Sequence, residues 1–344
     1  MRAMEPGGWL RGPVEGDYVE TVEGLLFTVK GLHHPRGFVV AYLRYVPDPG
    51  GERLRDGVRY RRVYDLDETD EYLRVNHPQY INEVEGTGLS LQSVPVDMIT
   101  RMYVPRERLT AILESPRTGV ELSVARFASA ISCEGGVSLT DMGVSGSVLV
   151  GMATSTSDVD LIVYGRESGR RVFNAVKALR EMEGWIRPYD AEGVRSVTVD
   201  RWGDTGIDLE ALSALESRKV LHGLVDGRDY FIRLVREPDA YEKGEVSRPL
   251  GAVVLRGTVV GADDSIYTPC SYDVEGCSFE GGGPSFDVVR LVSFRGKFTE
   301  QAVEGDVVEA RGTLEEVASG SLTYHRVMLG RRGDYLIQIG LVDR

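Results

Sequence analysis

The central part of the chain is defined by Met142-Gly-Val-Ser-Gly-Ser-Val-Leu-Val-Gly-Met-Ala-Thr-Ser-Thr-Ser-Asp-Val-Asp-Leu-Ile-Val-Tyr-Gly165. The pattern predicts a small-residue turn that opens a helix at Gly146-Ser147, then a polar loop, then a strand carrying Asp158 and Asp160. Side chains alternate along a strand, so the two carboxylates point to one side while Val159 faces the core. Carboxylates placed side by side repel each other unless a cation lies between them. The stretch therefore predicts a cation site.

The two halves of this stretch suit one kind of ligand. Oxygen ligands at this spacing favour Mg²⁺ (or Mn²⁺), which keeps several waters and takes further ligands from phosphates. Gly146 and Ser147 offer a backbone without bulk, N–H groups and a hydroxyl, and Ser157 is a further candidate for nucleotide binding. We therefore expect phosphoryl chemistry on an NTP. A solvated acidic turn would explain the carboxylates, but not the Gly-Ser pair in front of them.

The spacing of these motifs resembles a known signature. A Gly-Ser pair, ten residues and then Asp-hydrophobic-Asp-hydrophobic is similar to the pattern of the DNA polymerase β superfamily of nucleotidyltransferases, over about residues 136–235. The resemblance implies an enzyme that transfers an NMP from an NTP to a hydroxyl acceptor, with Asp158 and Asp160 as catalytic metal ligands. The competing interpretation is a catalytically inactive nucleotide- or RNA-binding protein on the same fold.

The resemblance also implies a third catalytic carboxylate on a neighbouring strand, and the sequence leaves its identity open. Asp208, in Gly-Ile-Asp-Leu, is slightly favoured. Asp200 is the alternative, because it would end a predicted strand over residues 194–200. If the relevant strand is instead residues 230–235, Arg233 occupies the acidic position and the site is inactive.

The flanking segments predict an α/β (α+β) multidomain protein. Residues 1–110 are expected to form a β-rich N-terminal domain, residues 111–247 the polymerase-β-like nucleotidyltransferase domain, and residues 248–344 an OB-like β-barrel. Helices are predicted from Pro105 to about residue 113 and from residue 119, where Thr118 and Glu121 have capping-box spacing. Five barrel strands are predicted, over residues 252–260, 288–295, 306–317, 324–329 and 335–339.

The predicted barrel makes single-stranded nucleic acid a candidate acceptor, because OB-folds bind it through aromatic and basic side chains. The candidate binding residues are Arg290, Phe294, Arg295, Tyr324 and Arg326. A barrel used only for packing or oligomerisation is an equal alternative. The formal net charge of −13 argues against a broad, nonspecific grip on duplex nucleic acid.

Composition bounds the location of the protein. No apolar run approaches the ~20 residues of a membrane span, and the N-terminus lacks a signal-peptide core, so we expect a cytoplasmic protein without a membrane partner. Arginine greatly outnumbers lysine, which fits a GC-rich genome and a thermophile. Cys270 and Cys277 flank a predicted turn and are either a disulfide or two thiols.

A second resemblance covers nearly the whole chain. The phrase Glu23-Gly-Leu-Leu-Phe-Thr-Val-Lys-Gly-Leu-His-His-Pro35, followed by Arg44-Tyr-Val-Pro47, is similar to the beginning of an uncharacterised archaeal family of predicted nucleotidyltransferases. It implies a reaction class and no particular substrate.

Overall fold

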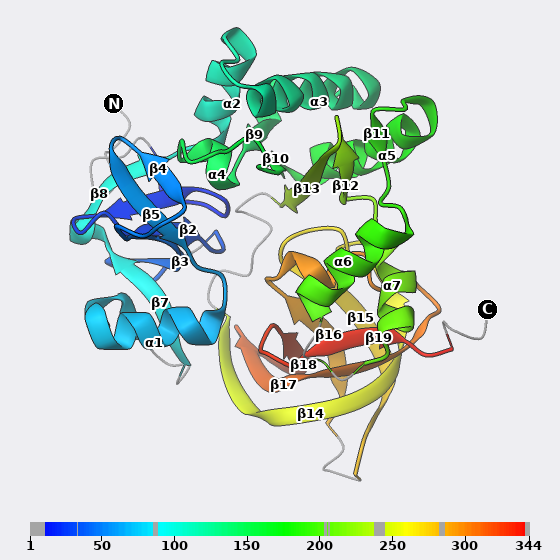
Figure 1. Cartoon of the computed structure of the whole chain (residues 1–344). Coiled ribbons are helices and arrows are strands. Elements are labelled where there is room, and N and C mark those ends of the chain that lie inside the picture. The colour runs from blue at the N-terminus through cyan, green and yellow to red at the C-terminus, as the bar shows by residue number, and fades with distance from the viewer. Residues whose placement is uncertain are drawn as a thin grey trace. The chain divides into compact units, whose positions relative to one another are not determined.

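The computed structural model describes residues 11–32, 34–84, 89–202, 205, 207–236, 245–281 and 286–340 (Figure 1). Its architecture is mixed α/β with several sheets. The chain divides into two compact units, Met1–Tyr164 with Arg228–Phe231, and Gly165–Gly227 with Ile232–Arg344. The division passes through strand β13 (Arg228–Val235), and each unit is described by itself. The predicted domain boundaries after residues 110 and 247 stay predictions.

The first unit begins with a β-sheet that confirms the β-rich N-terminal prediction. Its strand order is β4-β5-β3-β2-β1-β8, with β7 paired to β3 and β6 paired to β7. Its strands are β1 (Tyr18–Thr21), β2 (Leu26–Val29), β3 (Phe38–Pro47), β4 (Arg53–Arg55), β5 (Val58–Arg62), β6 (Ile81–Val84), β7 (Leu89–Pro95) and β8 (Ile99–Tyr103). Burial alternates along β3, the pattern expected when one face of a strand covers a core. Helix α1 (Leu66–Asn76) follows β5 and is capped by Asp65.

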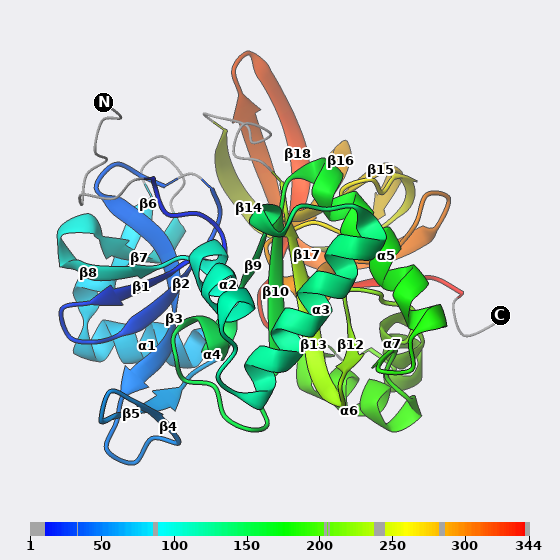
Figure 2. The same cartoon turned by 90° about the horizontal axis from the view of Figure 1, so that it is seen from above.

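Two helices and a strand pair complete the first unit. Helices α2 (Pro105–Glu114) and α3 (Gly119–Gly135) confirm the predicted helices, and the Thr118 side chain accepts a hydrogen bond from the Glu121 backbone N–H as expected. Strand β9 (Met142–Val144) pairs antiparallel with β10 (Val159–Tyr164), and the first residues of β13 neighbour β10 in the sheet order. Helix α3 runs beside β10 in both views (Figures 1 and 2).

The second unit contains one clear correction. Residues 194–200, predicted as a strand, belong to helix α6 (Ala191–Trp202). Val194, Thr198 and Trp202 are buried at a spacing of four residues, which is the period of a helix face. The β-branched residues of this segment suggested a strand, but packing overrides intrinsic propensity. The other elements here are α5 (Arg166–Met182), β11 (Ile186–Arg187), α7 (Leu209–Glu216) and β12 (His222–Val225).

The C-terminal strands of the second unit form a closed ring of pairings. The ring runs β14-β15-β16-β18-β17 and returns to β14, with β16 and β18 parallel and the other pairs antiparallel. The strands are β14 (Val246–Gly261), β15 (Cys270–Phe279), β16 (Val288–Ser293), β17 (Val307–Ser319), β18 (Leu322–Leu329) and β19 (Tyr335–Gln338), which pairs with β17. The five predicted segments are therefore strands, and β15 is an additional one.

Strand β15 settles the cysteine question. The segment between Cys270 and Cys277 was expected to turn, but burial alternates through Cys270, Tyr272 and Val274 as in a strand. Both cysteines are free, and their Sγ atoms lie 3.6 and 3.5 Å from the carbonyl oxygens of Ser293 and Val288. Two cysteines seven residues apart on one extended strand lie too far apart for a disulfide.

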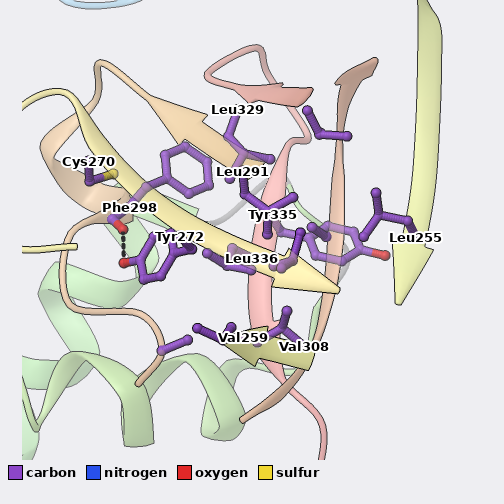
Figure 3. Close-up of a cluster of buried hydrophobic side chains, with 14 of the residues drawn as sticks. Leu255, Val259, Cys270, Tyr272, Leu291, Phe298, Val308, Leu329, Tyr335 and Leu336 are labelled. Atoms are coloured by element: carbon purple, nitrogen blue, oxygen red, sulfur yellow. Dashed lines mark hydrogen bonds between the residues drawn. The ribbon is translucent and has the colours of Figure 1, made fainter. Parts of the chain in front are cut away.

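The core of the ring includes side chains from the helices of the same unit. Trp202 of α6 and Leu212 of α7 belong to the same buried cluster as the ring strands. Figure 3 shows part of this cluster, in which the Tyr272 hydroxyl donates a hydrogen bond of 2.6 Å to the Phe298 carbonyl oxygen. These helices are thus held by the ring itself.

A buried ionic network lies in the second unit. The Glu216 carboxylate accepts hydrogen bonds from Trp202 Nε1 at 2.8 Å, Lys219 Nζ at 2.8 Å and Arg201 Nη1 at 3.1 Å. Lys219 Nζ also donates to the Lys297 carbonyl oxygen at 2.7 Å. The side chains of Glu216 and Lys219 are almost completely buried, so the charged form of each residue is stabilised by the opposite charge of the other.

In the described part of the chain, no helix is both long and apolar enough to cross a membrane.

Candidate active site

The two carboxylates of the motif lie at the beginning of β10. Asp158 directly precedes the strand and Asp160 is its second residue. Asp158 and Asp160 are both partly exposed, whereas Val159 and Leu161 are buried. The alternation is the one expected from the sequence, and it keeps both carboxylates out of the core.

Gly146 lies against the carboxylate of Asp160. Its φ is +61°, and a Cβ built on it would overlap Oδ2 of Asp160 and come within 3.0 Å of Cγ. The neighbouring Ser145 N–H donates a hydrogen bond of 2.8 Å to the Asp160 carbonyl oxygen. Glycine is therefore required here for two reasons, a left-handed backbone and the close approach of a carboxylate. The expected open space above Gly146 is occupied on this side by Asp160.

Of the two serines assigned to nucleotide binding, Ser147 lies in helix α4 (Gly146–Leu149) and Ser157 lies in the segment that links α4 to β10. Ser147 is buried within α4, and its carbonyl oxygen accepts a hydrogen bond of 2.8 Å from the Met152 N–H. Ser157 is buried, and its Oγ accepts a hydrogen bond of 2.8 Å from the Thr154 N–H. Ser157 therefore shapes the loop that delivers Asp158.

A third carboxylate that the sequence did not single out interacts with Asp158. Burial raises the pKa of Asp158, and the negative charge of Asp229 is the next largest cause of the rise. Asp229 is the second residue of β13 and is exposed. The next residue, Tyr230, is buried with its ring 4.9 Å from that of Phe127 on α3, which fixes the strand at this position.

The sequence contains a signal that would have found Asp229. Asp226 and Gly227 have φ values of +50° and +75°, and an Asp-Gly pair with positive φ is typical of a two-residue hairpin turn. Such a turn starts the next strand at Arg228 and puts Asp229 inside it. The prediction began this strand at residue 230, one residue too late to include the carboxylate.

The sequence offered three residues for the position of the third carboxylate, Asp208, Asp200 and Arg233, and each lies in a different part of the fold. Asp208 caps helix α7, because its Oδ1 accepts hydrogen bonds from the backbone N–H groups of Glu210 and Ala211 at 2.9 and 3.0 Å. Asp200 is exposed on α6, on the helix where a strand was expected. Arg233 lies further along β13. The catalytic role assigned to Asp208 stays a prediction, while the helix cap accounts for the residue by itself.

Two arginines of the N-terminal sheet complete the charge distribution around Asp158. The positive charges of Arg62 and Arg53 lower its pKa and so oppose the effects of burial and of Asp229. Arg53 Nη1 lies 3.2 Å from the Met152 carbonyl oxygen, 3.3 Å from Thr154 Oγ1 and 3.2 Å from Ser157 Oγ. The N-terminal sheet therefore contributes side chains to the same centre as β10 and β13.

The donor set can be compared with the expected metal. Among the described residues, no group of three or more His, Cys, Asp or Glu side chains is arranged to hold an ion. Mg²⁺ needs no such cage, because it is commonly bound by one or two carboxylates together with water and substrate phosphates. The two oxygen-donor side chains at the start of β10 fit that mode of binding.

The side chains predicted to bind nucleic acid are engaged within the barrel. Arg290 pairs with Asp273 at 2.7 Å, and Arg326 pairs with Glu315 at 2.9 Å. The Tyr324 hydroxyl donates to Glu245 at 2.7 Å, and Arg295 donates to the Gly330 carbonyl oxygen at 2.9 Å. Phe294 is 38% exposed. Nucleic acid would therefore have to compete with carboxylates for the arginines Arg290 and Arg326.

Comparison with known proteins gives one full-length relative. The chain is 27% identical over 327 residues to an uncharacterized protein, MJ1086, of Methanocaldococcus jannaschii, and the match covers 91% of this chain and 94% of that protein. No family model and no solved structure matches. These comparisons support the expected likeness to an uncharacterised archaeal family. The nucleotidyltransferase superfamily stays a proposal.

Proposed function

We propose that the protein is a metal-dependent nucleotidyltransferase that transfers an NMP from an NTP to a hydroxyl acceptor. The observation that carries the proposal is that Asp158 and Asp160 each have a partner of the expected kind, Asp229 for the first and Gly146 for the second. Gly146 touches the Asp160 carboxylate, and the charge of Asp229 acts on Asp158. An acidic centre behind a Gly-Ser turn is what the motif predicted, and we propose Asp229 as its third carboxylate instead of Asp208, which the sequence slightly favoured.

The proposed roles follow from the chemistry of each side chain. Asp158 and Asp160 would hold Mg²⁺ (or Mn²⁺), which in such sites offsets charge on transferring phosphates. Asp229, more exposed than Asp158, would accept the proton of the attacking hydroxyl. Ser147 and the backbone next to Gly146 would seat the phosphates, and Ser157 would keep the Asp158 loop in place. An NTP substrate and a cytoplasmic location are parts of this proposal.

We further propose that the five-stranded ring is an OB-type barrel and the central part a polymerase-β-like domain. The closed strand order and the parallel β16–β18 pair support a Greek-key barrel. A single-stranded nucleic acid acceptor remains the proposal for this barrel, with Phe294 as the accessible stacking side chain.

A catalytically inactive nucleotide- or RNA-binding protein is the second candidate. It is favoured by one observation, that the described residues contain no ready-made group of three metal-binding side chains. Asp229 favours the enzyme, because an inactive site gains nothing from a second negative charge that opposes ionisation of Asp158.

The test is nucleotide binding and transfer by the full chain. Labelled NTPs with Mg²⁺ or Mn²⁺ would be offered to RNA, protein and small-molecule acceptors. Asp158→Asn and Asp160→Asn are expected to abolish metal-dependent NTP binding and transfer, while Asp200→Asn, an exposed acid on α6, leaves both unchanged. A metal-dependent NTP affinity that equals the wild-type value in all three variants would refute the site. Binding without transfer to any acceptor would favour the inactive protein.

A further inference from the structure

The N-terminal sheet has one face that is turned toward the acidic centre. Arg53 on β4 is paired with Tyr60 on β5, and Arg62 on β5 is paired with Tyr45 on β3. Paired residues of antiparallel strands have side chains on the same face, and residues 60 and 62 of one strand also share a face. Arg53, Tyr60, Arg62 and Tyr45 therefore project from one side of the sheet.

This face packs on the segment that precedes Asp158. Tyr45 and Tyr60 belong to a buried cluster that includes Leu149, Val150 and Met152. Burial raises the pKa of Tyr45, and the charges of Arg62, Arg53 and Asp160 also act on it. The two arginines and the Asp160 carboxylate of β10 thus act on the same tyrosine within one unit.

The two arginines differ in their partners. Arg53 is used by the loop, through the carbonyl oxygen of Met152 and the hydroxyls of Thr154 and Ser157. The Arg62 guanidinium instead lies over the Tyr64 ring, with its Cζ 4.0 Å from the ring centroid. Among the described residues, no carboxylate forms an ion pair with Arg62 and no acceptor takes a hydrogen bond from its side chain. Its charge acts on Asp158 although no ion pair joins the two residues.

We propose that Arg62 is a phosphate-binding residue, which contacts the polyphosphate of the nucleotide from the N-terminal sheet. A guanidinium presents five donors in a planar fork that matches phosphate oxygens, and stacking on Tyr64 holds that fork in place. Because no described carboxylate forms an ion pair with Arg62, its donors are available to an anion that also meets Asp158 and Asp160. Arg53 acts through the loop and is a positioning residue.

This inference rests on the proposed function for the identity of the nucleotide, but the phosphate chemistry can be tested separately. The probes are inorganic tripolyphosphate, each NTP and a single-stranded RNA oligonucleotide, all with Mg²⁺, titrated into the full chain by calorimetry. The variant is Arg62→Gln. Arg59→Gln is the matched control, because Arg59 is exposed on the opposite face of the same strand and donates to the Gly51 carbonyl oxygen.

Arg62→Gln is expected to weaken tripolyphosphate and NTP binding by about tenfold or more, since hydrogen bonds between charged groups are the stronger class. Arg59→Gln should leave both affinities unchanged. Arg62→Lys keeps the charge without the fork and should lose less affinity than Arg62→Gln. Thermal unfolding of each variant shows whether it is folded. If Arg62→Gln is unfolded, the phosphate affinity of Arg62→Lys is compared with that of the wild type instead.

The outcomes separate this inference from the proposed function. NTP binding that is equal in the wild type and Arg62→Gln overturns the inference and leaves the function standing. Tripolyphosphate binding that depends on Arg62, without any NTP binding, supports the phosphate site and overturns the function. No binding of either probe overturns both. A loss confined to RNA assigns Arg62 to an acceptor strand and overturns the nucleotide assignment.

Discussion

The Cα of Gly146 lies so close to the carboxylate of Asp160 that no side chain fits between them. Gly151, five residues later, also has a positive φ, +73°, but an added Cβ would meet nothing within 4 Å. Substitutions at Gly146 and Gly151 therefore separate two effects. Both strain the backbone, but only a substitution at Gly146 displaces the Asp160 carboxylate.

Gly146→Ala should therefore cost more than Gly151→Ala. Both variants place an L-residue in the left-handed region, which costs roughly 1–2 kcal/mol of unfolding free energy. Gly146→Ala must also push Asp160 aside, and should lose NTP binding while Gly151→Ala keeps it. Urea unfolding and calorimetry measure the two effects. In an Asp160→Gly background the extra cost of Gly146→Ala should vanish, and an unchanged cost would show that the contact is unimportant.

Asp158→Asn should raise the thermal stability of the metal-free protein at neutral pH. The folded-state pKa of Asp158 is raised, by burial first and then by Asp229, so ionisation opposes folding. The difference between variant and wild type should disappear as pH falls below the ordinary value of 3.8, where both folded and unfolded chains are protonated. Melting curves from pH 3 to 7 measure it, with exposed Glu71→Gln on α1 as control. A variant less stable than wild type at pH 7 would contradict the argument.

Asp229→Asn and Asp208→Asn distinguish the two candidates for the third carboxylate. Asn caps a helix about as well as Asp, so Asp208→Asn should keep the fold and the activity. Asp229→Asn is expected to reduce transfer by about 100-fold or more, because general-base catalysis contributes that much. It should also lower the pKa of Asp158, measurable by NMR titration, since a negative charge is removed. The opposite ranking of the two variants would restore Asp208 to the catalytic role.

The buried pair Glu216 and Lys219 should dominate the acid stability of the second unit. Burial alone would raise the pKa of Glu216, but the charges of Lys219 and Arg201 outweigh it and lower the pKa to about 2. This stability is present above the ordinary value of 4.5 and is lost as pH falls toward 2. Glu216→Gln should cost about 3–5 kcal/mol at neutral pH, because Lys219 stays buried without its partner.

Glu316→Gln is the control for that prediction, since Glu316 pairs with Arg248 at 2.9 Å on the surface. Surface pairs contribute about 0–1 kcal/mol, so this variant should unfold nearly as the wild type does. Chemical denaturation at pH 7 measures the loss of unfolding free energy in both variants. Equal losses for Glu216→Gln and Glu316→Gln would show that the buried network does not stabilise the fold.

Local signals predicted much of the fold. The capping residues Thr118 and Glu121 and the alternation around Val159 depend on neighbours in sequence, and both were read correctly. The strand predicted for residues 194–200 was wrong. Their β-branched side chains favour a strand, but Val194 and Trp202 pack as one face of a helix. That choice depends on a core contributed by distant strands, which periodicity in a short segment does not report.

The candidate site divides in the same way. Asp158, Asp160 and Gly146 are close in sequence, and their motif is visible without a structure. Asp229 lies 69 residues after Asp160 in the sequence (229 − 160). Arg62 lies 98 residues before Asp160 (160 − 62). Only the pairing of strands brings such residues together. The Asp226-Gly227 turn was the one local clue, and it fixes where β13 begins.

The three hydrogen bonds that Arg53 donates to the loop before Asp158 come from a short edge strand. Strand β4 has only three residues and lies at the edge of its sheet. Elements of this kind open more readily than the core around them. Each opening would remove the hydrogen bonds of Arg53 to Met152, Thr154 and Ser157 and leave the loop with its own contacts, such as the one between the Thr154 N–H and Ser157 Oγ. The position of the segment before Asp158 therefore depends in part on a three-residue edge strand, and not only on the core of the unit.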